Sequence, residues 1–202
     1  PYSEVELLEL LADIKSTVPR YCRINRVIRD IPSTNVISGN RNTSLRQDVA
    51  RELKRRGEAC QCLRCREVRG GKIDRRNLQL HSLVYETGIA QEVFLSFDSP
   101  QDKVAGFLRL SLPHANLIGL EELEDAAMIR EVHVYGQSLE LGSEKQGAAQ
   151  HSGLGSRLIE EAVKVAKKAG YSRLAVISAI GTQAYYEQRN FRRKSYYMVR
   201  EI

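Results

Sequence analysis

Hydrophobic positions change their spacing partway along the chain, and this change predicts two kinds of structure. Over residues 4–16 they recur at helical intervals, and Ser3 with Glu6 forms a capping box in front of them. A second helix is predicted over 44–56, where basic residues crowd the sequence. The stretch 21–31 between the two helices has an extended pattern, so the first part of the chain is expected to be a small module.

From about residue 79 the pattern becomes that of a sheet. Short β-branched or aromatic runs separated by turn residues predict strands, and one long amphipathic run and one short segment predict helices. Antiparallel strands followed by strand, loop, helix, strand, helix and strand predict a mixed α/β (α+β) domain. The expected strands cover 79–86, 91–97, 104–112, 128–135, 173–178 and 195–201, and the expected helices cover 153–169 and about 182–189.

Length and composition are those of a folded protein with an appended module. The chain has 202 residues, of which 42% are hydrophobic and 28% charged, which is enough for one full core. No apolar run reaches the roughly 18 residues that a membrane span needs, and the polar N-terminus does not resemble a signal peptide. We therefore expect no membrane segment and a cytoplasmic location. The missing initiator Met is what an excised piece of a longer protein would show.

Positive charge is concentrated in one segment. Residues 20–76 hold 16 Lys and Arg against 6 Asp and Glu, a net of +10, while the rest holds 15 against 19, a net of −4. Such a concentration is typical of proteins that contact a phosphate backbone. A solvated basic face, or a surface that docks on an acidic neighbouring domain, would give the same pattern.

A glycine pair marks a candidate anion site. Strand 128–135 is followed by a loop and then by a helix that is predicted to start at Gly153. Because Gly153 and Gly155 lack a Cβ, the backbone can approach a ligand closely, and the free N–H groups of a helix start favour an anion such as a pyrophosphate. Gln150 can donate from its amide. Taken alone, the pair fits tight helix–strand packing equally well.

Three cysteines predict a structural zinc site. Cys60, Cys62 and Cys65 fall within six residues, and thiolates at such spacing are usual zinc donors. Tetrahedral Zn²⁺ needs a fourth ligand, for which Cys22 is the natural candidate and His81 the main rival. Reduced, inert thiols are the alternative interpretation.

The surroundings of the glycine pair resemble the GNAT acetyltransferase superfamily. The match is Gln-x-x-Gly-x-Gly between a strand and a long helix, followed by a helix with Tyr185 and Tyr186. The resemblance implies that the earlier strand splays from its neighbour and that acetyl-CoA binds there. A phenol can protonate a leaving thiolate, and one of the two tyrosines would instead pack the helix. The residues implied for acetyl-CoA are Glu131, Val132, His133, Val134, Gln150, His151, Ser152, Gly153, Gly155 and Tyr186, with Tyr186, Glu131 and His133 as catalytic candidates.

Glu131, His133 and His151 each have a second interpretation. Glu131 is either a general base or a surface residue of its strand. The two histidines fit structural hydrogen bonding at least as well as proton transfer.

A closer resemblance, from about residue 18 to the C-terminus, is to the Elongator catalytic-subunit family. It is carried by Val18-Pro19-Arg20-Tyr21, Arg29-Asp30-Ile31-Pro32, Arg64-Cys65-Arg66-Glu67-Val68, Arg130-Glu131-Val132-His133-Val134-Tyr135-Gly136, Gln150-His151-x-Gly153-x-Gly155, Ala175-Val176-Ile177-Ser178 and Tyr196-Tyr197-Met198-Val199. Members join a radical-SAM domain to a GNAT-like domain and place a carboxymethyl-type group on C5 of the tRNA wobble uridine. None of the four cysteines lies in a cluster motif of the radical-SAM kind. S-adenosylmethionine and the 4Fe-4S cluster would therefore belong to a part that is missing here.

The resemblance implies a division of the chain and its partners. Residues 1–32 would be the last elements of the radical-SAM domain, 33–77 a basic zinc-binding linker, and 78–202 the GNAT-like domain. We expect tRNA, acetyl-CoA and the rest of the radical-SAM domain as partners, and a homodimer is left open. An ordinary lysine or small-molecule N-acetyltransferase, or an RNA-binding module without catalysis, are the competing functions. The residues expected to contact tRNA are Arg23, Arg26, Arg29, Arg46, Lys54, Arg55 and Arg56.

Overall fold

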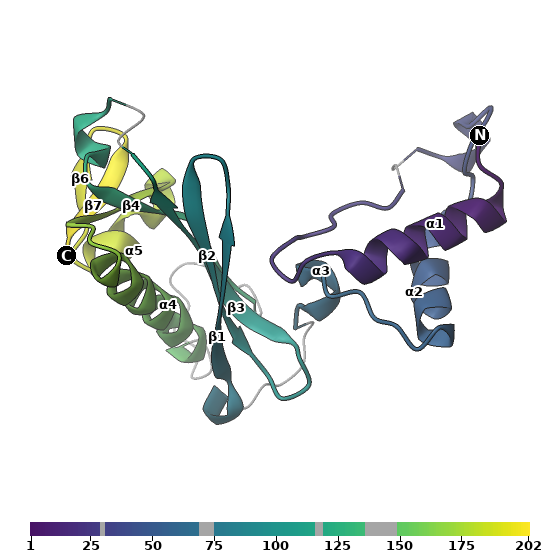
Figure 1. Cartoon of the computed structure of the whole chain (residues 1–202), viewed down its shortest axis with the longest axis horizontal. Coiled ribbons are helices and arrows are strands. Elements are labelled where there is room, and N and C mark those ends of the chain that lie inside the picture. Colours follow the sequence, from purple (N-terminus) through teal and green to yellow (C-terminus); the bar gives the residue numbers. More distant parts are fainter. Residues whose placement is uncertain (29–30, 69–74, 116–118, 136–148) are drawn as a thin grey trace. The chain divides into compact units, whose positions relative to one another are not determined.

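The computed structural model describes residues 1–28, 31–68, 75–115, 119–135 and 149–202, and for residues 75 and 149–152 the backbone alone. These residues form two compact units, Pro1–Glu67 and Val68–Ile202, each with its own core (Figure 1). No helix in the described ranges combines the length and the apolar character needed to cross a membrane.

The first unit is built on two packed helices. α1 spans Glu4–Thr17 and α2 spans Leu45–Arg55. The capping box predicted at Ser3 and Glu6 is confirmed. Because apolar residues recur every three or four positions on both helices, they bury one side against each other. The residues of this core are Ala12, Leu45, Val49 and Leu53.

The connections of the first unit differ from the expectation. Residues 21–28 form turns and irregular backbone rather than a strand, because no neighbouring strand among the described residues pairs with them. Two short elements that the spacing does not predict complete the unit, namely the 3₁₀ helix η1 (Ser33–Asn35) and helix α3 (Leu63–Arg66). The shared core of α1 and α2 joins segments on both sides of the domain boundary expected near residue 32.

The second unit is a seven-stranded mixed sheet with the order β1-β2-β3-β4-β5-β7-β6. β4 and β5 are parallel, and the other neighbours are antiparallel. The mixed α/β class is therefore confirmed. The strands are β1 (Gln79–Glu86), β2 (Ala90–Asp98), β3 (Val104–Pro113), β4 (Ala126–Val134), β5 (Arg173–Ile177), β6 (Arg192–Lys194) and β7 (Tyr197–Glu201). The helical segments are η2 (Arg75–Asn77), η3 (Glu121–Leu123), α4 (Ala149–Lys168), η4 (Ile180–Thr182) and α5 (Gln183–Glu187).

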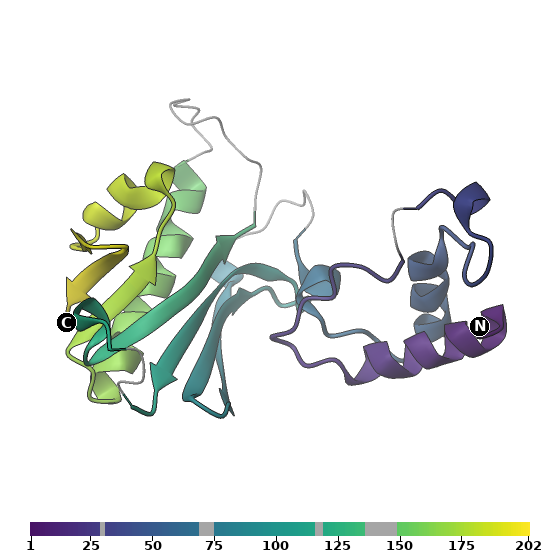
Figure 2. The ribbon, with the colours of Figure 1, turned by 90° about the horizontal axis from the view of Figure 1, so that it is seen from above.

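Helix α4 covers one face of this sheet, as Figures 1 and 2 show. Leu154, Leu158 and Ala162 follow helical spacing and are at most 3% exposed against Leu95 and Leu108 of the strands. Burying one leucine side chain such as Leu154 or Leu158 stabilises the fold by about 1.5–3 kcal/mol. The main core therefore lies between α4 and the sheet and fixes where α4 begins relative to β4.

Two boundaries differ from the predictions. α4 begins at Ala149, four residues before the expected start at Gly153, because helix formers precede the glycine pair. β6 was not predicted, because its residues Arg192, Arg193 and Lys194 are polar and exposed on the edge of the sheet. Lysine and arginine on an edge strand discourage pairing with other chains.

Candidate functional site

Strand β4 separates from β5 halfway along its length. The parallel pairing runs from Ala126 opposite Arg173 to Ile129 opposite Val176, where it ends. On its other side β4 stays paired with β3 up to Val134. In the described part of the chain, one backbone edge of residues 130–134 therefore has no strand beside it. This is the splayed strand that the resemblance implies.

A bulge in β4 lies at the same place. Arg109 of β3 pairs with Glu131, while the next residue Leu110 pairs with Ile129, so Arg130 is the extra residue. A bulge turns the side chains of consecutive residues toward one face and increases the local twist. The bulge therefore helps β4 to diverge from β5.

The two glycines of α4 have different surroundings. A Cβ added to Gly153 would meet no described atom within 4 Å. A Cβ added to Gly155 would lie 3.7 Å from Cγ2 of Val134, and its distance to the Tyr185 hydroxyl would be below the 3.0 Å that real Cβ atoms keep. Gly153 is thus open, whereas Gly155 lies in a tight contact between α4, β4 and α5.

Tyr186 lies on the α4 side of the sheet and belongs to the main core. It is 8% exposed and packs edge to face against Tyr185 and Phe191, with ring centroids 5.3 and 5.5 Å apart. Burial raises the pKa of Tyr186, and the neighbouring Tyr185 adds to this effect. The phenol therefore keeps its proton throughout the neutral range, as a proton donor must.

Glu131 and His133 lie on the opposite face of β4 from Val132 and Val134, which pack toward α4. The Nε atom of Arg109 donates a hydrogen bond of 2.9 Å to Glu131, and the two form an ion pair. His133 is exposed and stacks on Phe107 with a centroid distance of 5.7 Å. The structure therefore does not place these two side chains on the same face as Tyr186.

The same face holds a buried carboxylate. Glu92 of β2 has a side chain only 4% exposed, and it accepts hydrogen bonds from Ser111 at 2.8 Å and from Arg130 at 3.1 Å. The bulge thus places two consecutive residues of β4 in ion pairs, Arg130 with Glu92 and Glu131 with Arg109. These pairs fix the strand where it leaves β5.

Part of the predicted phosphate site lies outside the described side chains. This applies to Gln150, His151 and Ser152, whose backbone belongs to the first turn of α4. Arg29, expected to contact tRNA, also lies outside the described residues.

The three clustered cysteines converge in the first unit. The sulfur atoms of Cys60, Cys62 and Cys65 all lie within 4.8 Å of one another. A hydrogen bond from Cys60, and the positive charge of nearby Lys15, lower the pKa of Cys65 to about 5, which favours the metal-binding thiolate. The carbonyl of Cys22 accepts a 2.8 Å hydrogen bond from Leu63, but its sulfur is not among the three.

His81, the other candidate for the fourth ligand, lies on β1 in the second unit. The fourth ligand therefore stays a prediction.

Lys15 of α1 is a neighbour of this cluster that the sequence reasoning missed. It is 2% exposed, and its Nζ donates to the Cys65 sulfur at 3.8 Å. A signal was present, because Lys15 continues the helical stripe of Leu8, Leu11 and Ala12, and a lysine on a buried stripe needs a partner.

Most of the arginines expected to contact tRNA have partners inside the protein. Arg46 donates to the carbonyls of Ile24 and Asn25 at 3.0 and 3.2 Å. Arg56 pairs with Asp13 and Glu52 across α1 and α2, and Arg23 pairs with Glu67. These three side chains hold the unit together. Arg26 is exposed and also has a partner.

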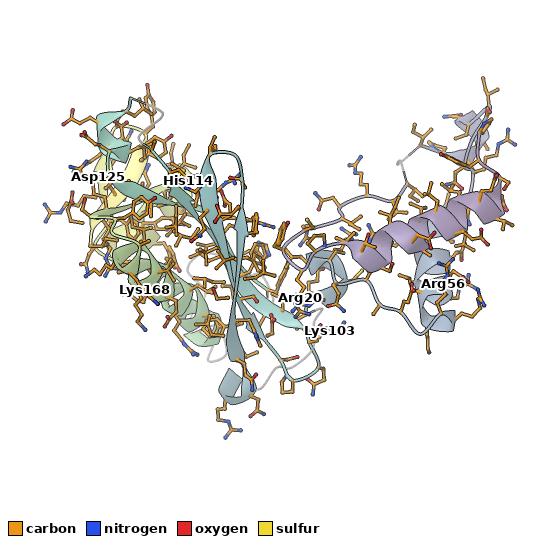
Figure 3. All side chains as sticks on the ribbon, viewed as in Figure 1. Arg20, Arg56, Lys103, His114, Asp125 and Lys168 are labelled. Atoms are coloured by element: carbon orange, nitrogen blue, oxygen red, sulfur yellow. The ribbon has the colours of Figure 1, made fainter. Side chains whose placement is uncertain are left out.

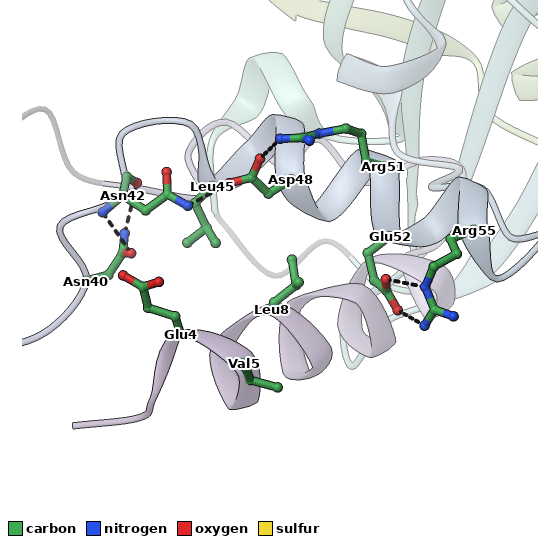
Figure 4. Close-up of a pocket in the computed structure, with 10 residues that line it drawn as sticks. All are labelled: Glu4, Val5, Leu8, Asn40, Asn42, Leu45, Asp48, Arg51, Glu52 and Arg55. Carbon is green, nitrogen blue, oxygen red and sulfur yellow. Dashed lines mark hydrogen bonds and ion pairs between the residues drawn. The ribbon is translucent and has the colours of Figure 1, made fainter.

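Two basic residues of α2 point to solvent. Arg55 is 74% exposed although it pairs with Glu52, and Lys54 is exposed with no ion pair to any described residue. Figure 4 shows the pair of Arg55 with Glu52, and that of Arg51 with Asp48, along the same helix.

Comparisons with known proteins cover the whole chain. The sequence is 37% identical to a protein named tRNA uridine(34) acetyltransferase from Dehalococcoides mccartyi, matching 100% of this chain and 45% of that protein. It is 35% identical to Elongator complex protein 3 of Bos taurus, matching 100% of this chain and 38% of that protein. No protein-family model matches.

The fold has a solved relative as well. The structure of Methanocaldococcus infernus Elp3 with residues 1–46 deleted aligns with a TM-score of 0.86 and 31% identity, over 100% of this chain and 49% of that one. The chain thus spans less than half the length of the relatives that it matches. Over the part that it spans, the chain belongs to the family of the tRNA uridine(34) acetyltransferases and Elongator complex protein 3.

Proposed function

We propose that this chain binds acetyl-CoA where β4 separates from β5 and that it is the acetyl-transfer part of a tRNA uridine(34) acetyltransferase. The observation that carries the proposal is the edge of β4 over residues 130–134, which has no strand beside it in the described part. Backbone N–H and C=O groups on such an edge accept an extended amide-containing chain, as an added strand would pair with them. The names of the relatives supply the reaction.

The start of α4 fits the phosphates of acetyl-CoA. The backbone N–H groups that have no partner inside helix α4 are those of its first turn, which begins at Ala149. Helix α4 is the next element after β4 in the chain. Gly153, one turn further on, leaves open space beside this turn. Bound there, acetyl-CoA would supply an acetyl group activated as a thioester. Gln150, His151, Ser152 and Gly153 are the proposed phosphate contacts.

Tyr186 is the proposed general acid. Its raised pKa keeps the phenol protonated, and it lies on the face of the sheet that α4 covers. A proton held at its Oη would be available to a leaving thiolate. Glu131 is the proposed general base, and His133 is a further candidate for proton transfer. Both lie on the other face of β4. Arg109 holds the Glu131 carboxylate in a fixed position there.

Cys60, Cys62 and Cys65 are the proposed zinc ligands. With Zn–S bonds of about 2.3 Å, the corners of a tetrahedral site lie about 3.8 Å apart, and the sulfur atoms here already lie within 4.8 Å of one another. Cys22, which belongs to the same unit, is the proposed fourth ligand. The role is structural, since a site with four protein ligands has no open position. Elemental assay of the purified chain tests it, and absence of zinc from protein folded with zinc supplied would refute it.

The first unit is proposed to contact tRNA through α2. Of the residues predicted for this role, Arg26, Lys54 and Arg55 are exposed, and Arg23 is exposed but pairs with Glu67. Arg46 and Arg56 are engaged inside the unit. We propose that tRNA phosphates contact Lys54 and Arg55 on α2 and the neighbouring Arg51, which is 80% exposed. The radical-SAM part, its cofactors, a homodimer and the cytoplasmic location stay predictions.

Titration calorimetry with acetyl-CoA tests the proposed site. A Gly153→Phe change should abolish binding, because the new side chain occupies the open space beside the first turn of α4. Gly88→Phe is the matched control, since Gly88 also has no described atom within 4 Å of an added Cβ but lies in the turn between β1 and β2. Circular dichroism should show both variants folded. Unchanged acetyl-CoA binding by folded Gly153→Phe would refute the site.

Thioester turnover separates the functions. We expect acetyl-CoA turnover that rises when tRNA is added. Turnover with a peptide amine in the absence of RNA would favour an ordinary N-acetyltransferase, and RNA binding without acetyl-CoA binding would favour a non-catalytic module. Either result would contradict the proposal.

A further inference from the structure

Tyr185 is fixed against the second glycine of α4. Its hydroxyl occupies the space that a Cβ on Gly155 would need, and its Cζ lies 3.6 Å from that Cβ position. The contact joins the helix start, the end of β4 and the short helix α5, because Val134 lies on the same spot. Gly155 is buried, whereas Gly153 is exposed and open. The two glycines therefore serve different neighbours.

Arg189 connects the two helices at this point. Its Nε and Nη2 donate to the hydroxyl of Ser156 on α4, at 3.0 and 2.7 Å, and its Nη1 donates to the carbonyl of Tyr185. The guanidinium lies 3.5 Å from the centroid of the Tyr185 ring. One planar side chain thus binds the residue after Gly155 and the residue before Tyr186. A lysine cannot reproduce this, because it lacks the flat fork.

Helix α5 needs such a connection. It spans only Gln183–Glu187, and isolated helices shorter than about 12 residues are marginal in water. Tyr186 is carried on this helix and packs edge to face on Tyr185. The interactions of Arg189 that hold Tyr185 against α4 therefore also position the phenol of Tyr186.

We propose that Gly155 lacks a side chain in order to accommodate the Tyr185 hydroxyl rather than to let acetyl-CoA approach, and that Arg189 and Ser156 are positioning residues that hold Tyr186 at the acetyl-transfer site. The second half of this proposal rests on the proposed function. The first half concerns the packing of the chain by itself.

A pair of substitutions, in which the second compensates for the first, tests the contact between Gly155 and the Tyr185 hydroxyl. Gly155→Ala should lower the thermal midpoint of the second unit, because the new methyl meets the hydroxyl of Tyr185, whose ring and carbonyl Arg189 holds in place. Adding Tyr185→Phe removes that hydroxyl and leaves an ordinary contact at Cζ, so the double variant should recover the midpoint. Gly153→Ala is the control, and its midpoint should not fall, because nothing described lies near and alanine is the better helix former.

The same variants separate this packing role of Gly155 from a role in ligand binding. If Gly155 serves Tyr185, the double variant regains acetyl-CoA binding together with its stability. A double variant that is stable yet still fails to bind acetyl-CoA would overturn the proposal, as would a Gly155→Ala protein as stable as the parent. If the parent chain binds no acetyl-CoA, the proposed function is refuted. Recovery of the thermal midpoint in the double variant would still test whether Gly155 accommodates the Tyr185 hydroxyl.

The positioning role is tested by kinetics. Arg189→Met should lower kcat of tRNA-stimulated acetyl-CoA turnover by about tenfold, because a small displacement of a catalytic group is costly, and should leave the Kd for acetyl-CoA within about twofold. Ser156→Ala, which removes one of the two anchors, should show a smaller loss of kcat. Equal losses in kcat and in acetyl-CoA affinity, or no loss in either, would overturn the positioning role.

Discussion

At the scale of residues, the adjacent tyrosines of α5 have different surroundings and therefore different roles. Tyr186 is buried in the main core, and Tyr185 is held by Arg189 against α4. From the sequence, both occupy a short helix after β5, and helical spacing does not separate two neighbours in the chain. Tyr185 differs from Tyr186 because its hydroxyl contacts Gly155 of α4 beside Val134 of β4. This contact depends on how α4 packs against β4.

Tyr186→Phe should lower turnover of acetyl-CoA by about a hundredfold, the lower end of general acid–base contributions, with little change in acetyl-CoA affinity. The ring remains in the core, so the fold should be kept. Tyr196→Phe is the control, because Tyr196 is 81% exposed and lies outside the site. Steady-state kinetics and calorimetry measure the two quantities. Equal turnover by the Tyr186 variant and the parent would exclude this phenol as the acid.

The pH profile gives a second readout for Tyr186. Burial raises its pKa above the ordinary value of about 10, so the protonated form persists to higher pH than in a free phenol. We expect kcat to show no decline that depends on Tyr186 between pH 7 and about 9.5. A loss of kcat with a midpoint below pH 9 that disappears in Tyr186→Phe would contradict this assignment.

At the scale of elements, strands and long helices follow from spacing, and irregular features do not. The short β-branched and aromatic runs between turn residues predict β2 and β3, and the apolar stripe of α4 predicts that helix. The glycine pair predicts a helix start at Gly153, yet the helix begins at Ala149, because Ala149 and Gln150 are good helix formers. The bulge at Arg130 leaves no mark in the residue types, although it helps to open the site.

Glu52 of α2 should make the first unit sensitive to acid. Hydrogen bonds from Arg55, and then from Arg56, lower the pKa of Glu52 from 4.5 to about 2. A carboxyl with a depressed folded-state pKa adds stability above its unfolded value, and this stability is lost as pH falls through the folded value. The contribution should therefore be complete above pH 4.5 and fade toward pH 2.

Urea unfolding followed by the helical circular dichroism signal checks this expectation. The difference in midpoint between the parent and Glu52→Gln should shrink from pH 5 to pH 2. Glu58→Gln is the control, because Glu58 is exposed and makes no ion pair with a described residue. A difference that stays constant, or that grows as the pH falls, would show that Glu52 does not act through its ionised form.

At the scale of the whole molecule, the two units differ in charge and in chemistry. The positive charge is concentrated in residues 20–76, most of which lie in the first unit, and the splayed strand lies in the second. The sequence identified this division from composition. It did not separate structural arginines from exposed ones, because a residue type does not tell whether a carboxylate or a carbonyl lies within reach, as for Arg46 and Arg56.

Charge reversal on α2 should weaken tRNA binding. Lys54→Glu should lower affinity several-fold and reduce the slope of log K against log salt by about one to two, since a phosphate contact releases counterions. Lys168→Glu is the matched control at the end of α4, where Figure 3 labels Lys168. Fluorescence anisotropy with labelled tRNA at several salt concentrations measures both. Equal effects of the two reversals would indicate a nonspecific charge response.

Hydrogen–deuterium exchange of the chain with and without acetyl-CoA tests whether the open edge of β4 and the start of α4 bind this ligand. Acetyl-CoA should slow exchange of amides in residues 130–134 and in the first turn of α4, while exchange in β1 is unchanged. Protection confined to other segments, with the open edge of β4 exchanging as fast as before, would contradict the proposed site.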